Sequence, residues 1–308
     1  GYMVVSYDLL LYNNYVCVEP FKTQKHYRFI NGDMLDKDKL KPIISDVNAV
    51  ILLAGLVGDP VTKKYPKESK VINDIAVKGV INLCSEVNIE RFIFISTCSN
   101  YGLIKEDKFA DENHDLKPLS LYSKSKVNAE EYILSLKGKT KMNPTILRFA
   151  TAFGLSNRMR FDLTISEFVR ELMLGNELIV YDENTWRPYC HVYDFARLIL
   201  LILESSLDKI SFEVFNAGSK KNNATKKMIV DMISKKIKDP KVKYLNHGSD
   251  PRNYKVNFDK VKNELGFEPV YDIEYGISEL IDSMKNGNFK NLHPNRNFYG
   301  NYEINYPI

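Results

Sequence analysis

The stretch Arg91-Phe-Ile-Phe-Ile-Ser-Thr-Cys-Ser-Asn-Tyr-Gly102 decides the fold of this chain. Its first part is short and almost entirely apolar, which indicates a buried strand. Polar residues begin at Ser96 and Thr97, where that strand is predicted to end. Ligands of a parallel sheet bind at the carboxyl ends of its strands. The stretch therefore predicts a parallel α/β sheet with a polar edge that begins near Thr97.

Strand-like and helix-like periods alternate through residues 1–154, which is the pattern of a doubly wound parallel sheet. Helices are predicted at Pro66–Glu86 and Ser123–Leu136, because apolar residues recur there at helical spacing. The predicted strands of this part are Met3–Tyr7, Tyr27–Asn31, Ala49–Ala54, Arg91–Ser96 and Pro144–Arg148.

The regular alternation of strand-like and helix-like segments ends after Gly154. We expect residues 155–308 to form mainly a smaller α/β lobe, with some segments that return to the main sheet. The tail from Asn286 has no periodicity and is interpreted as a strap on the surface or at an interface. The elements predicted in this half are helices at Leu163–Leu174, Asp194–Glu204, Lys226–Lys238 and Ile273–Lys285, a strand at Leu178–Tyr181 and a strand ending at Phe215.

Composition excludes several classes of protein. The net charge is only +4, with basic residues scattered along the chain, so no nucleic-acid-binding surface is indicated. The longest apolar runs, such as Arg197–Glu204, are too short to cross a bilayer. The cysteines are far apart and contain no C-x-x-C pair, which favours free thiols in a reducing compartment over a metal site or disulfides. We therefore expect a cytoplasmic protein with no membrane partner. The cysteines are Cys17, Cys84, Cys98 and Cys190.

The strongest candidate for chemistry is Tyr122-Ser-Lys-Ser-Lys126 at the start of a predicted helix. Residues at i and i+4 share a helix face, so Tyr122 and Lys126 are expected to lie together. An ammonium beside a phenol favours the phenolate, which lowers the tyrosine pKa toward a value useful for a general base. The pattern also occurs by chance at solvated helix starts. A hydroxyl at Thr97 could bind the same substrate oxygen, and this context favours a catalytic role.

Thr97, Tyr122 and Lys126 together resemble the Ser/Thr–Tyr–Lys triad of the short-chain dehydrogenase/reductase superfamily. Further motifs, in the same order along nearly the whole chain, resemble its extended branch, the NAD-dependent nucleotide-sugar epimerase/dehydratase family, and within it enzymes like UDP-glucose 4-epimerase. These motifs are Asn31-Gly-Asp33, Leu53-Ala-Gly-Leu-Val-Gly-Asp-Pro60, Asn73, Leu147-Arg-Phe-Ala-Thr-Ala-Phe-Gly154, Arg187-Pro-Tyr-Cys-His-Val-Tyr-Asp194, Phe215-Asn-Ala-Gly218 and Arg252…Asp259…Leu265-Gly-Phe-Glu-Pro269.

The resemblance implies a Rossmann-like dinucleotide-binding domain in residues 1–154, a substrate lobe in residues 155–308, and a homodimer built on Pro66–Glu86 and Ser123–Leu136. It also implies NAD as cofactor and a UDP-, GDP-, dTDP- or CDP-linked sugar as substrate. Asp8, after the first visible strand, suits the adenosine ribose hydroxyls and favours NAD over NADP. The implied cofactor contacts are Asp8, Asp33, Met34, Leu53, Ala54, Gly55, Asn73, Tyr122 and Lys126.

The implied substrate contacts include arginines, whose planar fork suits a diphosphate. Arg158 is a weaker candidate of the same kind, and His191 is expected to be structural. The implied substrate-binding residues are Cys98, Ser99, Thr151, Arg160, Arg187 and Arg252.

Departures from the family pattern reduce the number of family reactions that this chain is expected to catalyse. Family members that eliminate water carry an acidic pair directly after the catalytic Ser/Thr, whereas this chain has Cys98 and Ser99. Neither side chain readily replaces a carboxyl group at neutral pH, so 4,6-dehydration is disfavoured. Thr151 stands where many members have an asparagine, which puts the usual substrate contacts in doubt. The run Asn157–Asp162 looks closer to a subgroup that includes C4 dehydrogenases of GDP-heptoses.

The family pattern begins with a strand and a glycine-rich turn, G-x-x-G-x-x-G, which holds the cofactor pyrophosphate. Gly1–Asp8 corresponds to the second strand of that pattern, after the helix that the glycine-rich turn opens. Without the first strand, two strand edges and an apolar surface would be exposed. We therefore expect the natural protein to have a further segment of about twenty-five residues upstream, and NAD binding to be impaired without it.

Three functions are consistent with these residues. The leading one is an NAD-dependent enzyme acting at C4 of a nucleotide-linked hexose or heptose, with Tyr122 as the base. A C4 dehydrogenase or 4-keto reductase, which releases or consumes a keto sugar, is the alternative within the class. A non-catalytic binding subunit of the same fold is the alternative outside it.

Overall fold

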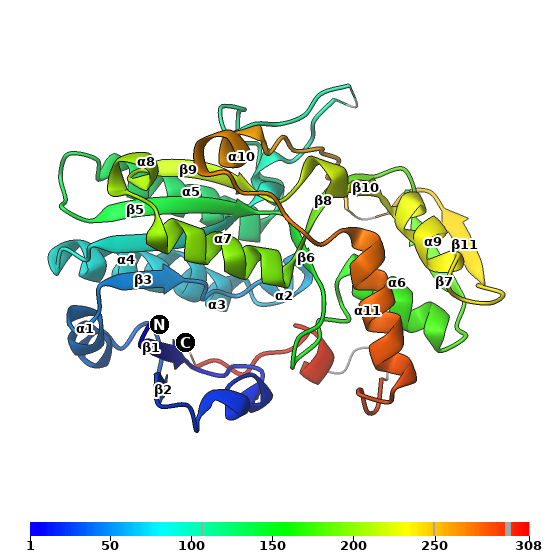
Figure 1. The fold of residues 1–308 in the computed structure, drawn as a ribbon, viewed down its shortest axis with the longest axis horizontal. Helices are drawn as coiled ribbons and strands as arrows, with labels where there is room; N and C mark the ends of the chain where they lie inside the picture. The colour runs from blue at the N-terminus through cyan, green and yellow to red at the C-terminus, as the bar shows by residue number, and fades with distance from the viewer. Residues whose placement is uncertain (106, 249, 293–296, 308) are drawn as a thin grey trace.

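The computed structural model describes residues 1–308 except 106, 249, 293–296 and 308. Four parallel strands form the central sheet in the order β3-β4-β5-β9. Helix α7 crosses one face of this sheet, and α4 and α5 cover the other (Figure 1). This is the predicted doubly wound parallel arrangement. The strands are β3 (Ala49–Leu52), β4 (Arg91–Thr97), β5 (Asn143–Phe149) and β9 (Glu213–Ala217), and the helices are α4 (Val77–Glu86), α5 (Leu121–Ser135) and α7 (Val192–Glu204).

Strand β4 is buried on both faces, as its apolar sequence predicts. Phe92 and Phe94 pack into the cluster that includes α4 and α5. Ile93 and Ile95 point the other way, into the cluster that includes α7. Side chains alternate between the two faces of a strand, so one run of residues supplies both halves of the core.

Strands β1 (Val4–Asp8) and β2 (Tyr27–Asn31) form a separate parallel pair. Among the described residues, β1 pairs only with β2 and β3 pairs only with β4. Val4 in β1 is correspondingly exposed.

The predicted helix Pro66–Glu86 is one continuous helical stretch with a change of pitch. It consists of α3 (Pro66–Ser69), a π-helical segment η3 (Lys70–Ala76) and α4. The remaining elements of this half are α1 (Lys37–Ser45), α2 (Asp59–Lys64) and the short 3-10 segments η1 (Tyr15–Cys17), η2 (Glu19–Phe21) and η4 (Cys98–Tyr101).

Much of the second half forms a lobe beside the carboxyl ends of the main strands, while α7 and β9 return to the main sheet (Figure 1). The core of the lobe joins three helices, α6 (Thr164–Met173), α9 (Lys226–Ser234) and α11 (Ile273–Lys285). Two small sheets complete it, β10-β8-β6 and β11-β7. Their strands are β6 (Thr151–Phe153), β7 (Leu178–Tyr181), β8 (Trp186–His191), β10 (Asn223–Thr225) and β11 (Val242–Leu245), and the short 3-10 segments of this half are η5 (Lys220–Asn222) and η6 (Asn297–Tyr299). Two short helices of the second half, α8 (Leu207–Ile210) and α10 (Asp259–Leu265), pack on the main sheet instead.

The end of the chain runs back from the second lobe to the β1–β2 pair (Figure 1). Asn301 is buried and donates a hydrogen bond to the Val57 carbonyl at 3.1 Å. Tyr306 is buried as well, and its hydroxyl donates to Asp33 Oδ2 at 2.8 Å. The tail therefore runs along the surface on two buried anchors, Asn301 and Tyr306, while Glu303, Asn305 and Pro307 are exposed.

No helix in the described part of the chain has the length and apolar character needed to cross a membrane.

Candidate functional site

The start of α5 is held in place by its cap. Ser120 Oγ accepts a hydrogen bond from the Ser123 backbone N–H at 3.2 Å, and Ser123 Oγ contacts the Ser120 N–H in return. Such reciprocal bonds satisfy amides that lack partners in the first turn of a helix. Tyr122 lies in this capped turn and is partly buried. The cap therefore fixes the backbone that carries the candidate base.

Lys126 follows one turn later and is buried. Its Nζ lies 5.9 Å from the centroid of the Tyr122 ring and donates to the Ile95 carbonyl at 2.7 Å. Ile95 stands two residues before Thr97 in β4. One ammonium thus joins the helix of Tyr122 to the strand that ends in Thr97, so the predicted catalytic residues share one region of the molecule.

Thr97 caps the short segment η4. Its Oγ1 accepts from the Ser99 N–H at 3.1 Å and lies 2.9 Å from Ser99 Oγ. Cys98 points the other way, into the core cluster on the α7 side, and its thiol donates to the Arg148 carbonyl. Burial raises the pKa of Cys98. The prediction that Cys98 binds substrate is therefore wrong, because the tight turn after Thr97 alternates side chains between the site and the core.

The charge environment of Tyr122 differs from the prediction. Its pKa is raised above the ordinary value, first by burial and then by the Asp59 carboxylate. The cations that lower it are Arg160 and Arg252. The expected lowering of this pKa by Lys126 is thus wrong for this structure, where burial dominates. Burial also lowers the pKa of Lys126 to about 8, an effect that the Glu130 carboxylate opposes.

Glu130, one further turn along α5, was not identified from the sequence. It is buried and forms an ion pair with Arg148 at 2.7 Å. It also accepts a hydrogen bond from Asn100 Nδ2 at 2.8 Å and one from the Ser96 hydroxyl. Glu130 therefore ties α5 to the ends of β4 and β5. The Lys-x-x-x-Glu spacing that follows Tyr-x-x-x-Lys is the signal that could have revealed it.

Most of the predicted cofactor contacts line one cavity of about 220 Å³ between β1, β2 and β3. Asp8 Oδ1 accepts from the Leu10 N–H at 2.6 Å, and Asp33 Oδ1 accepts from the Leu35 N–H at 2.9 Å. Two carboxylates beside an apolar wall suit the adenosine part of NAD, because one can bind ribose hydroxyls and the wall can bind the base. The lining includes Asp8, Asp33, Met34, Leu53, Ala54, Gly55 and, from the tail, Tyr306.

Asn73 holds the Leu56 backbone, which lines this cavity. Its Oδ1 accepts from the Leu56 N–H at 2.7 Å, and its Nδ2 donates to the Leu56 carbonyl at 3.0 Å. Gly55 has a φ of +154°, and a Cβ there would lie 3.1 Å from Asn73 Oδ1. Asn73 therefore holds the loop that forms the cavity wall, and its amide is engaged by backbone instead of facing the cavity.

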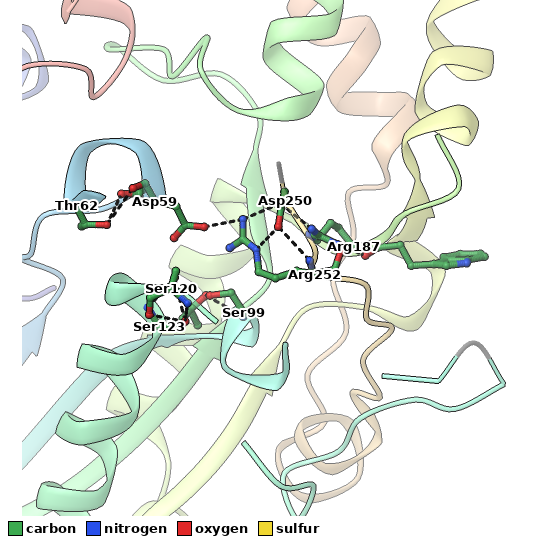
Figure 2. A network of polar contacts seen from close by, with 11 residues as sticks. Asp59, Thr62, Ser99, Ser120, Ser123, Arg187, Asp250 and Arg252 are labelled. Atoms are coloured by element: carbon green, nitrogen blue, oxygen red, sulfur yellow. Dashed lines mark hydrogen bonds and ion pairs between the residues drawn. The ribbon is translucent and has the colours of Figure 1, made fainter. Parts of the chain in front are cut away.

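The predicted diphosphate-binding arginines are joined by carboxylates (Figure 2). Arg252 donates to both oxygens of Asp250, at 2.7 and 2.8 Å, and its Nη2 lies 2.8 Å from Asp59 Oδ2. Arg187 Nη2 donates to Asp250 at 2.8 Å, and its Nη1 donates to the carbonyls of Trp186 and Arg252. Asp250 therefore bridges two arginines from segments far apart in the sequence. Neither Asp59 nor Asp250 was identified from the sequence.

The other predicted substrate residues lie at the lobe boundary. Arg160 binds Asp162 through two hydrogen bonds, at 2.6 and 2.7 Å. Thr151 begins β6 and is partly buried opposite Tyr189 of β8. Arg158 donates to the Asn297 and Gly300 carbonyls and so anchors the tail.

His191 is structural, as expected. It is fully buried and caps α7 by accepting from the Tyr193 N–H at 3.2 Å. Its Nε2 lies 3.1 Å from Glu279 Oε2.

The doubly wound sheet, the second lobe and the placement of Thr97, Tyr122 and Lys126 are those of an extended short-chain dehydrogenase/reductase. The sequence profile of the NAD dependent epimerase/dehydratase family matches residues 4–218, and the chain belongs to this family. The family and fold predicted from the sequence are confirmed, and NAD is the cofactor of the family.

Relatives of different activities are similar to this chain. A putative UDP-glucose 4-epimerase of Methanocaldococcus jannaschii is 26% identical over 289 residues, which cover 92% of each chain. The structure of a Bacillus cereus UDP-glucuronic acid 4-epimerase in complex with UDP-glucuronic acid and NAD has a TM-score of 0.83, 23% identity and coverage of 92% and 91%. That of a Bacillus anthracis dTDP-glucose 4,6-dehydratase in complex with NAD has a TM-score of 0.79, 25% identity and coverage of 94% and 90%. Because epimerases and dehydratases both occur among them, similarity alone does not select the reaction.

Proposed function

We propose that this chain is an NAD-dependent epimerase or oxidoreductase acting at C4 of a nucleotide-linked hexose or heptose. The observation that carries the proposal is the bond from Lys126 Nζ to the Ile95 carbonyl, because it joins the turn of Tyr122 to the strand end of Thr97. A base, a cation and a hydroxyl donor on one sheet edge are the groups that proton transfer at a sugar carbinol requires.

Each residue has a distinct part in this proposal. Tyr122 removes the proton from the O4 hydroxyl and returns it after the change at C4. The Thr97 hydroxyl orients O4. Lys126 supplies positive charge near the phenol, while Arg160 and Arg252 offset part of the burial effect that keeps Tyr122 protonated. Bound NAD supplies the hydride acceptor and donor, and Asp8, Asp33 and the cavity between them hold its adenosine part.

We propose that the reaction does not eliminate water. A 4,6-elimination needs an acid and a base at C5 and C6, and the two residues after Thr97 provide neither. The Cys98 thiol faces the core with a raised pKa and so stays neutral, and Ser99 offers only a hydroxyl. Mass spectrometry of the product of a nucleotide hexose tests this directly, since loss of water from the substrate would contradict it.

A C4 dehydrogenase or 4-keto reductase is the alternative within the same site. These enzymes change the oxidation state of the sugar, whereas an epimerase returns the hydride that it removes. NADH absorbance during turnover of UDP-, GDP-, dTDP- and CDP-sugars separates them. A steady change in absorbance indicates the oxidoreductase, and conversion without any change indicates the epimerase.

We also propose a homodimer through the helices of Pro66–Glu86 and α5. Apolar side chains on this surface are exposed in the single chain, with Ile75 55%, Leu121 45% and Leu134 36% exposed. Burial of such a patch between two copies is favourable. Sedimentation as a monomer at micromolar concentration would contradict the dimer.

The Tyr122→Phe variant tests the proposed function. Loss of the hydroxyl should reduce kcat by about a hundredfold or more and should leave nucleotide-sugar binding nearly unchanged. Tyr132→Phe is the matched control, because Tyr132 lies on the same helix and its hydroxyl donates to Asn82. Near-normal turnover by Tyr122→Phe would remove tyrosine from the mechanism.

A further inference from the structure

One oxygen of Asp59 has a partner and the other has none. Gly58 has a φ of +115°, and directly after it Asp59 begins α2 with its carboxylate directed at Arg252 (Figure 2). Oδ2 lies 2.8 Å from Arg252 Nη2. Oδ1 is buried, and no hydrogen-bond donor among the described residues lies within reach of it. A buried acceptor without a partner is costly, so this oxygen indicates a place for a donor from a ligand.

Asp59 belongs to the surroundings of the candidate base. Helix α2 packs against α5, and Asp59 has the largest effect of any charged group on Tyr122. Its side chain as a whole is 30% exposed, although Oδ1 itself is buried. The partly exposed carboxylate of Asp59 therefore lies among the groups that surround a substrate reacting at Tyr122.

The arginines around this site already have carboxylate partners. Arg160 is paired with Asp162, Arg187 with Asp250, and Arg252 with Asp250 and Asp59. Three positive and three negative charges thus balance before any substrate binds. The diphosphate of a nucleotide sugar adds negative charge that the arginines can accept. A further carboxylate on the sugar would meet Asp59 without an additional arginine to neutralise it.

We propose that Asp59 is a specificity-determining residue that selects nucleotide sugars with an uncharged sugar and disfavours uronic acids. The partly exposed carboxylate of Asp59 accepts a hydrogen bond from a sugar hydroxyl. A carboxylate in the same position could not donate and would be repelled. This inference rests on the proposed C4 activity, and it goes beyond it by naming the class of sugar.

Matched substrate pairs that differ only at C6 test the inference on the NAD-loaded protein. UDP-glucose with UDP-glucuronic acid, and GDP-mannose with GDP-mannuronic acid, are suitable probes. The comparison is made with the UDP pair or the GDP pair, whichever the enzyme turns over. Within that pair, kcat/KM for the uncharged sugar should exceed that for the uronate by about tenfold or more. Asp59→Asn should reduce this ratio about tenfold or more, because the amide no longer repels the carboxylate. Asp46→Asn, at an exposed position after α1, should leave the ratio unchanged.

The outcomes separate this inference from the proposed function. Turnover at C4 of the uronate as fast as the uncharged sugar, or an unchanged ratio in Asp59→Asn, overturns the inference and leaves the C4 activity standing. Absence of C4 turnover with both members of every pair overturns the proposed function and, with it, the inference. If Asp59→Asn does not fold, the wild-type ratio and Asp59→Glu decide, since Glu keeps the charge and should keep the preference.

Discussion

Lys126 donates a hydrogen bond from its buried ammonium to the Ile95 carbonyl at 2.7 Å, and thereby joins the helix of Tyr122 to the strand of Thr97. The ammonium has lost most of its water in this position, which is unfavourable for a charge. The protein keeps it there although a neutral side chain would be easier to bury. That cost is consistent with a requirement for positive charge at this point of the site.

Replacement of Lys126 by methionine should change how stability depends on pH. The folded pKa of Lys126 is lowered from 10.5 to about 8, so between these values the unfolded chain binds more protons than the folded one. The free energy of unfolding therefore rises with pH in that window, by up to roughly 3 kcal/mol from this group. Lys126→Met should remove this part of the rise. Urea unfolding at pH 7.5, 9 and 10.5 measures it. An equally steep rise in the variant would contradict the lowered pKa, and exposed Lys124→Met is the control.

Replacement of Glu130 by glutamine should destabilise the fold strongly. It would leave Arg148 buried without its counter-charge, which costs about 3–5 kcal/mol. The exposed neighbour Glu131 provides the matched control, since Glu131→Gln should change stability by less than about 0.5 kcal/mol. Denaturant unfolding of both variants gives the comparison. Equal small losses would show that the Glu130–Arg148 pair contributes little.

The tail residue Tyr306 should weaken NAD binding, because its hydroxyl donates a hydrogen bond to the carboxylate of Asp33, which is a predicted adenosine contact. Tyr306→Phe removes one hydrogen bond and should tighten NAD binding by about two- to tenfold. Titration of NAD by calorimetry measures the change. Exposed Tyr275→Phe should behave like the wild type. Weaker binding by Tyr306→Phe would indicate that the tail forms part of the cofactor site instead of competing with it.

Asp8 should determine the choice between NAD and NADP. Its carboxylate lines the cavity at the end of β1 and would repel a 2′-phosphate. Asp8→Asn should lower the preference for NAD over NADP by about tenfold. The ratio of the two dissociation constants is the measurement, with exposed Asp38→Asn as the control. An unchanged ratio would remove Asp8 from the ribose site.

The sequence determined the family and the central sheet, and it predicted the candidate catalytic set. Buried strands such as Arg91–Thr97 are apolar over their whole length, and their helices carry regular apolar spacing, so local pattern and fold agree. The tail and β8 were not predictable in this way. β8 contains Pro188, which argues against a strand from sequence alone, and its position is set by pairing with β10 and β6.

Only the tertiary structure decided the electrostatics of the site. Asp59 and Arg187 come from segments far from Asp250 and Arg252, and no local pattern signals that they pair with them. The inward turn of Cys98 and the raised pKa of Tyr122 depend on which side chains bury them. Local sequence specifies strands, helices and caps because these depend on near neighbours. Burial and ion pairing depend on residues that only folding brings together.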